Sequence, residues 1–259
     1  MLMKKLAVAA LTVAVVFSLT GCGAAKEDTK QYIETVESYP HVEKVTTGLD
    51  LVKTPPEWKI DSTVVLDDTA TYDDYIQVSS KVAAYQESSK RDIDADYQVG
   101  GKVELEEGVE KNVFDLSQRF NNDDSLASVN LASYYFKATL APEVSDPSEA
   151  VRGVYRAYEA SGIEAPRVEI KSARERYAVE FPEGSTPEAI ADRLAFVDYL
   201  FTQDTVLGVT YYGGVNIKLT DSSQMSEVKA NTEAYLADHP ALKAGLGEIR
   251  YTSPDEKRS

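Results

Sequence analysis

The chain is poor in the residues that build covalent and metal centres. It contains one cysteine and two histidines in 259 residues. A single cysteine excludes an internal disulfide, and with two distant histidines it excludes a zinc site of the usual ligand spacing. Stability must therefore come from a packed core, which 43% hydrophobic residues can supply.

Sequence motifs of the common enzyme classes are also missing. There is no Gly-x-Ser-x-Gly elbow, no phosphate-binding Gly-x-x-x-x-Gly-Lys loop and no Gly-x-Gly-x-x-Gly fingerprint. Adjacent carboxylates occur at Asp67-Asp68, Asp73-Asp74 and Asp123-Asp124, but a chain with 43 acidic residues contains such pairs by chance. We therefore expect no catalytic residue and no cofactor, and we expect the protein not to be an enzyme.

The best metal candidate is a short run of alternating acids. Asp92, Asp94 and Asp96 resemble the opening of a calcium loop, but Tyr97 replaces its glycine and Val103 its glutamate. We read the run as a charged entry to a hairpin. His41 and His239 lack specified partners and fit polar helix ends near the negative pole of the dipole. The sequence therefore predicts no metal site.

Positive charge is scarce. The formal net charge is −16, and no cluster of Lys and Arg stands out. Such a chain is repelled by nucleic acid and by anionic lipid headgroups. We therefore expect no nucleic-acid partner and no electrostatic attachment to a membrane.

The N-terminal segment carries the strongest single signal. Lys4 and Lys5 precede an apolar stretch of about 14 residues, short of the roughly 20 that span a bilayer. The run Leu19-Thr20-Gly21-Cys22 follows it and resembles the lipobox of bacterial lipoproteins. The resemblance implies a signal peptide over residues 1–21, cleavage before Cys22 and a diacylglycerol on its sulfur. The alternatives are an ordinary signal peptide with a chance cysteine and a retained membrane helix.

The lipoprotein interpretation places the mature chain outside the cytoplasm, lipid-anchored to the cell membrane. Removal of the leader takes away two lysines, so 25 basic residues would face 43 acidic ones. The acyl chains on Cys22 would hold the protein at the membrane, at roughly 0.8 kcal/mol per buried methylene. Residues 22–29 read as a polar tether and residues 254–259 as a loose tail.

A repeat runs through the rest of the chain. Six segments with apolar residues at helical spacing begin near Tyr32, Tyr75, Val109, Val151, Ile190 and Met225. Capping signals precede three of them, at Thr71, Asp146-Pro147 and Thr186-Pro187. Alternating runs predict strands at 42–52 and 59–66, 95–99 and 102–106, 128–131 and 134–140, 167–171 and 177–181, 206–212 and 215–219, and 247–251. Glycine pairs at 100–101 and 213–214 suit tight hairpins.

The pattern predicts an α+β fold of tandem αββ repeats. Two repeats together would form an αββαββ layer, an antiparallel sheet with its helices on one face. We expect three such modules at 30–108, 109–184 and 185–253. The element order is similar in outline to the BON-type modules of bacterial envelope proteins. One continuous α+β domain without true repeats is the alternative.

Tyrosine is abundant, with 16 residues. Tyr134-Tyr135 and Tyr211-Tyr212 lie on predicted hairpins, where exposed rings stack on sugars or line a partner surface; tyrosine is also simply a favoured strand residue. Trp58 reads as a core anchor. These features favour a non-enzymatic interaction or scaffold module of the cell envelope with a protein or glycan partner. A solute- or glycan-binding lipoprotein and an envelope enzyme are the alternatives.

Overall fold

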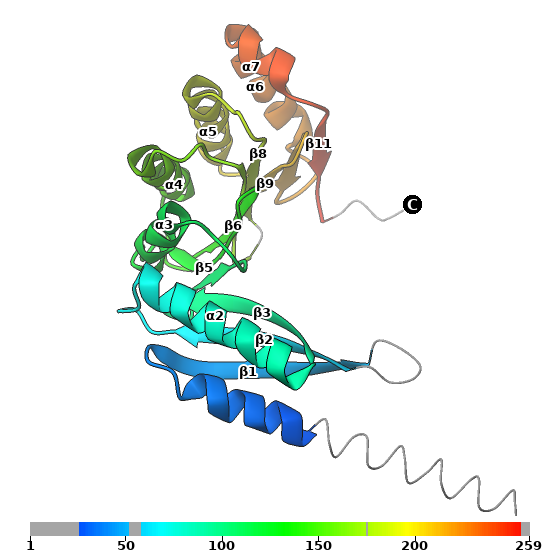
Figure 1. Ribbon diagram of the computed structural model, residues 1–259. Helices are drawn as coiled ribbons and strands as arrows, with labels where there is room; N and C mark the ends of the chain where they lie inside the picture. The colour runs from blue at the N-terminus through cyan, green and yellow to red at the C-terminus, as the bar shows by residue number, and fades with distance from the viewer. Residues whose placement is uncertain (1–25, 52–57, 175, 255–259) are drawn as a thin grey trace, which may run out of the picture. The chain divides into compact units, whose positions relative to one another are not determined.

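The computed structural model describes residues 26–51, 58–174 and 176–254 (Figure 1). The leader, Cys22, most of the tether and residues 255–259 lie outside this part of the chain, as does the side chain of Trp58. The chain divides into two compact units. Unit 1 runs to Gly101 and includes Glu106–Gly108, and unit 2 comprises Lys102–Leu105 and the chain from Val109 onward.

Unit 1 is a three-stranded sheet with two helices. Its order along the chain is a helix over residues 26–37, β1 (Val42–Leu51), β2 (Trp58–Leu66), α2 (Tyr72–Ser89) and β3 (Asp92–Val99). Strand β2 pairs antiparallel with β1 and parallel with β3. The connection through α2 returns the chain to the starting end of β2, which explains the parallel pair.

Both helices of unit 1 pack on one face of this sheet. The Tyr32 hydroxyl, from the first helix, donates to Ser62 Oγ of β2 at 2.9 Å, and the Tyr32 ring lies 5.5 Å from that of Tyr85 in α2. Tyr75 of α2 meets Tyr97 of β3 edge-on at 5.2 Å. Alternate residues of β3 are buried and exposed, so its second face is left to solvent.

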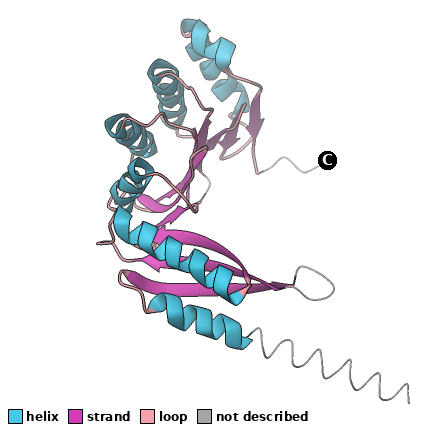
Figure 2. Ribbon diagram, in the orientation of Figure 1, coloured by secondary structure: helices cyan, strands magenta, loops and turns pink. Residues whose placement is uncertain are grey.

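Unit 2 continues the same order of elements. Its elements are β4 (Val103–Leu105), α3 (Lys111–Asn121), β5 (Leu126–Leu131), β6 (Tyr135–Leu140), α4 (Pro147–Ser161), β7 (Arg167–Ser172), β8 (Tyr177–Phe181), α5 (Pro187–Phe201), β9 (Val206–Tyr211), β10 (Val215–Leu219), α6 (Met225–Asp238), α7 (Pro240–Gly245) and β11 (Ile249–Thr252). Helices α3 to α6 lie in a row along one side of the strands (Figure 2).

The strands of unit 2 lie in chain order, and their directions follow from their connections. Hairpin-linked strands pair antiparallel: β5 with β6, β7 with β8 and β9 with β10. Helix-linked strands pair parallel: β4 with β5, β6 with β7, β8 with β9 and β10 with β11. The prediction of antiparallel sheets is therefore wrong, because a helix between two strands brings the chain back to run in the same direction. The sheets are mixed.

Local sequence chemistry sets several helix starts. Asp146 accepts a hydrogen bond from the backbone N–H of Glu149, and proline follows it at the first helical position of α4. Thr186 caps α5 in the same way, and Thr71 forms a reciprocal capping box with Asp74 at the start of α2. Each cap satisfies N–H groups that the helix leaves unpaired.

The core of unit 2 lies between its helices and one face of its sheet. Phe136 of β6 is fully buried, 4.9 Å from the ring of Phe120 in α3 and 5.9 Å from that of Tyr158 in α4. Neighbouring β7 contributes Val168 and Ile170, both fully buried. The side chains at intervening strand positions point to the opposite face.

The predicted α+β class is confirmed, and each observed strand begins and ends within three residues of its expected range. Gly100, Gly101 and Gly213 adopt positive φ at the predicted turns, which glycine reaches without steric cost. Among the helices of the described residues, none has the length and apolar character needed to cross a bilayer.

Candidate interaction surface

The sheet of unit 2 has an open face, which we define as the face opposite its helices. No described element of the unit packs on it, so its longer side chains are exposed or half-buried, although the small Ala178 of β8 is buried between its neighbours. The strands project onto it a mixture of polar, charged and tyrosine side chains, in contrast to the aliphatic and aromatic face beneath the helices. A sheet that buries one face and leaves the other to solvent offers a ready surface for a partner.

One end of the open face carries two tyrosines. Tyr134, in the β5–β6 turn, is 65% exposed, the highest value among the large hydrophobic side chains described as exposed. Its ring lies 4.9 Å from that of Tyr135 at an interplanar angle of 66°. The Tyr135 hydroxyl donates to Asn130 Oδ1 at 2.8 Å, which fixes that ring in place. The hairpin therefore presents one exposed ring supported by a second, anchored ring.

Charged side chains cross the open face from strand to strand. Lys137 of β6 lies opposite Glu169 of β7, with Nζ 3.3 Å from Oε2. Arg167 of β7 pairs with Glu180 of β8 at 2.9 Å, and the Glu180 carboxylate raises the pKa of the guanidinium. The Tyr212 hydroxyl, from the β9–β10 turn, donates to Glu169 Oε1 at 3.3 Å. These contacts connect β6, β7 and β8 with the β9–β10 turn.

Three adjoining hollows make a shallow trough along the open face. Their volumes are about 290, 380 and 330 Å³. The first and second share Glu169, and the second and third share Thr210 and Tyr212. We call this combined surface the trough; its polar and aromatic lining comprises Tyr134, Tyr135, Lys137, Arg167, Glu169, Lys171, Glu180, Thr210, Tyr212, Asn216, Glu248 and Arg250.

The charge of the trough differs from that of the chain. Four basic side chains line it, Lys137, Arg167, Lys171 and Arg250, against three acidic ones. The whole chain carries a formal net charge of −16. Basic side chains are thus concentrated on this face beside tyrosine rings, a combination that is enriched at recognition surfaces.

The open face of unit 1 is acidic instead. Lys59 Nζ lies 2.5 Å from Asp94 and 3.4 Å from Asp61. Burial raises the pKa of Asp96, and the neighbouring Asp94 and Asp61 carboxylates raise it further.

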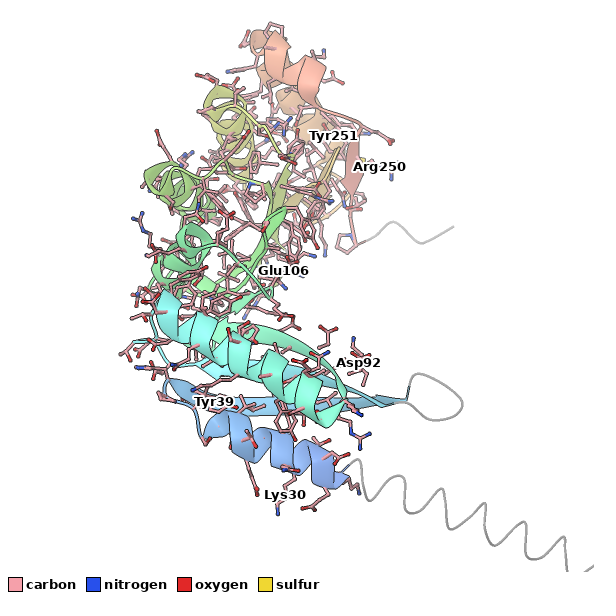
Figure 3. All side chains as sticks on the ribbon, in the orientation of Figure 1. Lys30, Tyr39, Asp92, Glu106, Arg250 and Tyr251 are labelled. Atoms are coloured by element: carbon pink, nitrogen blue, oxygen red, sulfur yellow. The ribbon has the colours of Figure 1, made fainter. Side chains whose placement is uncertain are left out.

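The acids with the calcium-like spacing lie on an extended strand rather than in a loop (Figure 3 labels Asp92). Their side chains thus form a row with a spacing of about 7 Å, too open to wrap one ion. Among the described residues, no cluster of three or more His, Cys, Asp or Glu side chains is suited to a metal.

The structure brings one histidine to two of the adjacent acid pairs. His41 Nδ1 lies 3.2 Å from Asp67 and its Nε2 lies 3.9 Å from Asp74. Both carboxylates accept hydrogen bonds from nearby threonines. Asp67 accepts from the Thr69 hydroxyl and Asp74 from the Thr71 hydroxyl, and each bond lowers the pKa of the carboxylate that accepts it. The cluster stabilises the junction of β2 with α2.

The remaining sequence candidates occupy turns and helix ends. Asp123 accepts from the backbone N–H and the hydroxyl of Ser125 after α3. His239 ends α6, with its ring stacked 4.1 Å from that of Tyr235. Neither residue is part of the trough lining.

A separate hollow of about 500 Å³ lies on the helix side between α4 and α5. Both basic side chains in its lining are already paired: Arg152 with Asp198 at 3.0 Å and Arg156 with Glu149 at 2.7 Å. The hydroxyls of Tyr155 and Tyr158 are buried there from solvent and have no hydrogen-bond partner among the described residues. A ligand in this hollow would not reach them without a rearrangement.

Of the four tyrosines on the two hairpins, three lie on the open face and one lies on the buried face. Tyr134, Tyr135 and Tyr212 line the trough. Tyr211 is buried on the opposite face, with the Arg193 guanidinium 5.2 Å from its ring centroid. Successive strand residues point to opposite faces, so Tyr211 and Tyr212 cannot both belong to one surface. The basic lining was missed because its residues come from strands far apart in sequence.

Comparison of the chain with protein-family models, curated proteins and solved structures gives no match.

Proposed function

We propose that the protein is a lipid-anchored, non-enzymatic interaction module of the cell envelope, and that the trough is its partner-binding surface. The observation that carries the proposal is the concentration of tyrosine and basic side chains on the open face of an otherwise acidic chain. Paired charges and hydroxyls give such a surface directional contacts, and the exposed Tyr134 ring gives it apolar area.

The anchor and the location are part of the same proposal. The lipobox run ending at Cys22 supports cleavage, lipidation and retention on the extracytoplasmic side of the membrane. The net charge of −16 supports attachment through the lipid rather than through basic residues, and it argues against nucleic acid as a partner.

The finer architecture also belongs to the proposal. We propose that consecutive αββ repeats pair into αββαββ layers like BON-type modules, with boundaries at 30–108, 109–184 and 185–253. The order of elements along the chain supports this pairing. A protein built from repeats of one small unit gains a long binding surface from the accumulated strands, which suits a scaffold.

A glycan-binding function is the second candidate. The observation that favours it is the Tyr134 ring, which is 65% exposed and lies against the anchored Tyr135 ring. Aromatic faces stack on sugar rings, and Asn130 and Glu169 supply hydrogen-bonding oxygens nearby. Envelope glycans are the ligands to screen for this function.

The experiment compares capture of envelope proteins by wild-type and variant chains from detergent-solubilised membranes, with quantitative mass spectrometry. Tyr134→Ala and Arg167→Glu are each expected to reduce the yield of a specific partner roughly tenfold, the usual effect of removing a tyrosine or arginine that carries binding energy. The matched control is Arg119→Glu, which makes the same charge reversal at an exposed position of α3 on the helix side.

Arg119→Glu is expected to leave capture unchanged. An equal loss of captured partner with all three variants would contradict the assignment of the trough as the binding surface. A partner protein that is never recovered, combined with a thermal shift produced by an envelope glycan and abolished by Tyr134→Ala, would favour the second candidate instead.

A further inference from the structure

Strand β11 forms one edge of the unit 2 sheet. It pairs in parallel with β10 on one side, and no described strand pairs with its other side. A strand with a free edge exposes a row of backbone N–H and C=O groups that favour another strand. The edge is four residues long, Ile249–Thr252.

A groove of about 840 Å³ runs beside this edge on the helix side. Its floor and walls come from β11, α6, α7 and the segment between α7 and β11. Apolar contributors include Leu236, Leu246, Ile249 and Tyr251. We call it the β11 groove. It differs from the trough, which lies on the other face; Arg250 and Tyr251 are successive residues of β11 and so point to opposite faces (Figure 3).

The helix-facing side chains of β11 are less buried than those of the equivalent strands β7 and β9. Strands β7 and β9 also follow a helix and pair in parallel with the preceding strand. Their residues facing the helices, Val168 and Ile170 in β7 and Val209 and Tyr211 in β9, are 4% exposed or less. The corresponding Ile249 and Tyr251 of β11 are only half-buried.

The difference has a structural cause. In the earlier repeats an antiparallel strand continues the sheet, β8 beside β7 and β10 beside β9. At β11 that strand is absent from the described residues. The repeat thus specifies both the conformation and the direction of what would complete it: an extended segment antiparallel to β11, with apolar side chains at alternate positions.

The charge of the groove indicates which charged side chains its occupant should carry. Two basic side chains, Lys229 and Lys243, line its helix side against one acidic one, Glu233. Arg250 and Glu248 also border the groove, but they pair with each other at 2.6 Å and are shared with the trough. Residues 255–259 of this chain, Asp-Glu-Lys-Arg-Ser, contain no apolar side chain to fill it. An occupant with acidic residues next to its apolar ones therefore matches the groove better than this segment does.

We propose that the β11 groove binds an extended, acidic segment of a partner protein, which adds to the sheet as an antiparallel strand. Backbone hydrogen bonds to Ile249–Thr252 would supply affinity, and alternate apolar side chains over Leu236, Leu246 and Tyr251 would supply specificity. The groove shares only Glu248 and Arg250 with the trough and lies on the helix side, so its binding does not depend on the trough binding a partner.

The test uses a synthetic heptapeptide with the sequence of residues 177–183, Tyr-Ala-Val-Glu-Phe-Pro-Glu. This segment contains β8, which is the antiparallel neighbour of β7 within the fold. The peptide is titrated into the lipid-free chain (Cys22→Ser), and amide NMR spectra and hydrogen exchange are recorded. We expect saturable shifts confined to residues 229–252 and amide exchange at Ile249–Thr252 slowed about tenfold or more.

Matched peptides and variants separate the contributions. Replacing Val179 of the peptide by proline removes a backbone N–H, and replacing Glu180 and Glu183 by lysine reverses the charge; both changes should abolish the shifts. Lys243→Glu in the protein should weaken binding several-fold. Lys218→Glu, an exposed lysine on the other face of β10, should have no effect.

Several results would overturn the proposal. These are the absence of shifts at millimolar peptide, equal binding of the proline peptide, and equal weakening by Lys218→Glu and Lys243→Glu. Self-association of the chain without peptide, seen by light scattering and removed by Lys243→Glu, would also overturn it, because the occupant would then be a second copy.

Discussion

Cys22→Ala is expected to abolish lipid attachment completely. The thiol of Cys22 is the only one in the chain, so no other side chain can form a thioether with a diacylglycerol. Cleavage before residue 22 should fail with it, because the resemblance to bacterial lipoproteins implies that both steps require this cysteine. The measurement is the intact mass and the N-terminal peptide of the protein extracted from membranes.

The wild-type N-terminal peptide should begin at Cys22 and carry the added mass of acyl chains, whereas the variant should begin at Met1 without it. Thr20→Ala is the matched control, since it keeps a small residue within the lipobox and should be processed normally. An unmodified Cys22 in the wild-type protein would contradict the anchor.

Phe136→Ala is expected to destabilise unit 2 by about 3–5 kcal/mol, the usual cost of removing a buried aromatic side chain. Phe136 is fully buried and contacts the Phe120 and Tyr158 rings, so alanine leaves a cavity between two helices and the sheet. Domains are commonly stable by about 5–15 kcal/mol, which makes this a large share of the total. The measurement is urea denaturation followed by circular dichroism.

Tyr134→Ala provides the control for this prediction. Tyr134 is two residues away but 65% exposed, so its truncation should change stability by no more than about 0.5 kcal/mol. The pair of variants thus tests which side chains of this hairpin belong to the core. Similar losses at the two positions would contradict the assignment of a buried and an open face.

Much of the fold could be predicted because helix starts and strands depend on short stretches of neighbouring residues. Asp146 and Thr186 mark helix starts through capping and a following proline, and both helices begin there. Alternation of apolar residues located the strands. The antiparallel prediction is right for the hairpin-linked strands and wrong for the helix-linked ones, because a helix between two strands returns the chain to run in the same direction.

The candidate site could be predicted only in part. Tyr134, Tyr135 and Tyr212 were identified from their hairpins, and all three line the trough. The basic part of the lining could not be predicted, since Lys137 and Arg250 are separated by more than a hundred residues and come to line one trough only through the strand order. His41 and Asp67 were likewise considered separately, although the structure places them 3.2 Å apart.

The claim that the open face receives a partner in the envelope is tested most directly by site-specific photocrosslinking in intact cells. A photoreactive amino acid would replace Tyr134 on the open face in one strain and Arg119 on the helix side in another. The account predicts a discrete crosslinked product in the membrane fraction from position 134 and none from position 119. Identical products from the two positions, or none from position 134, would contradict it.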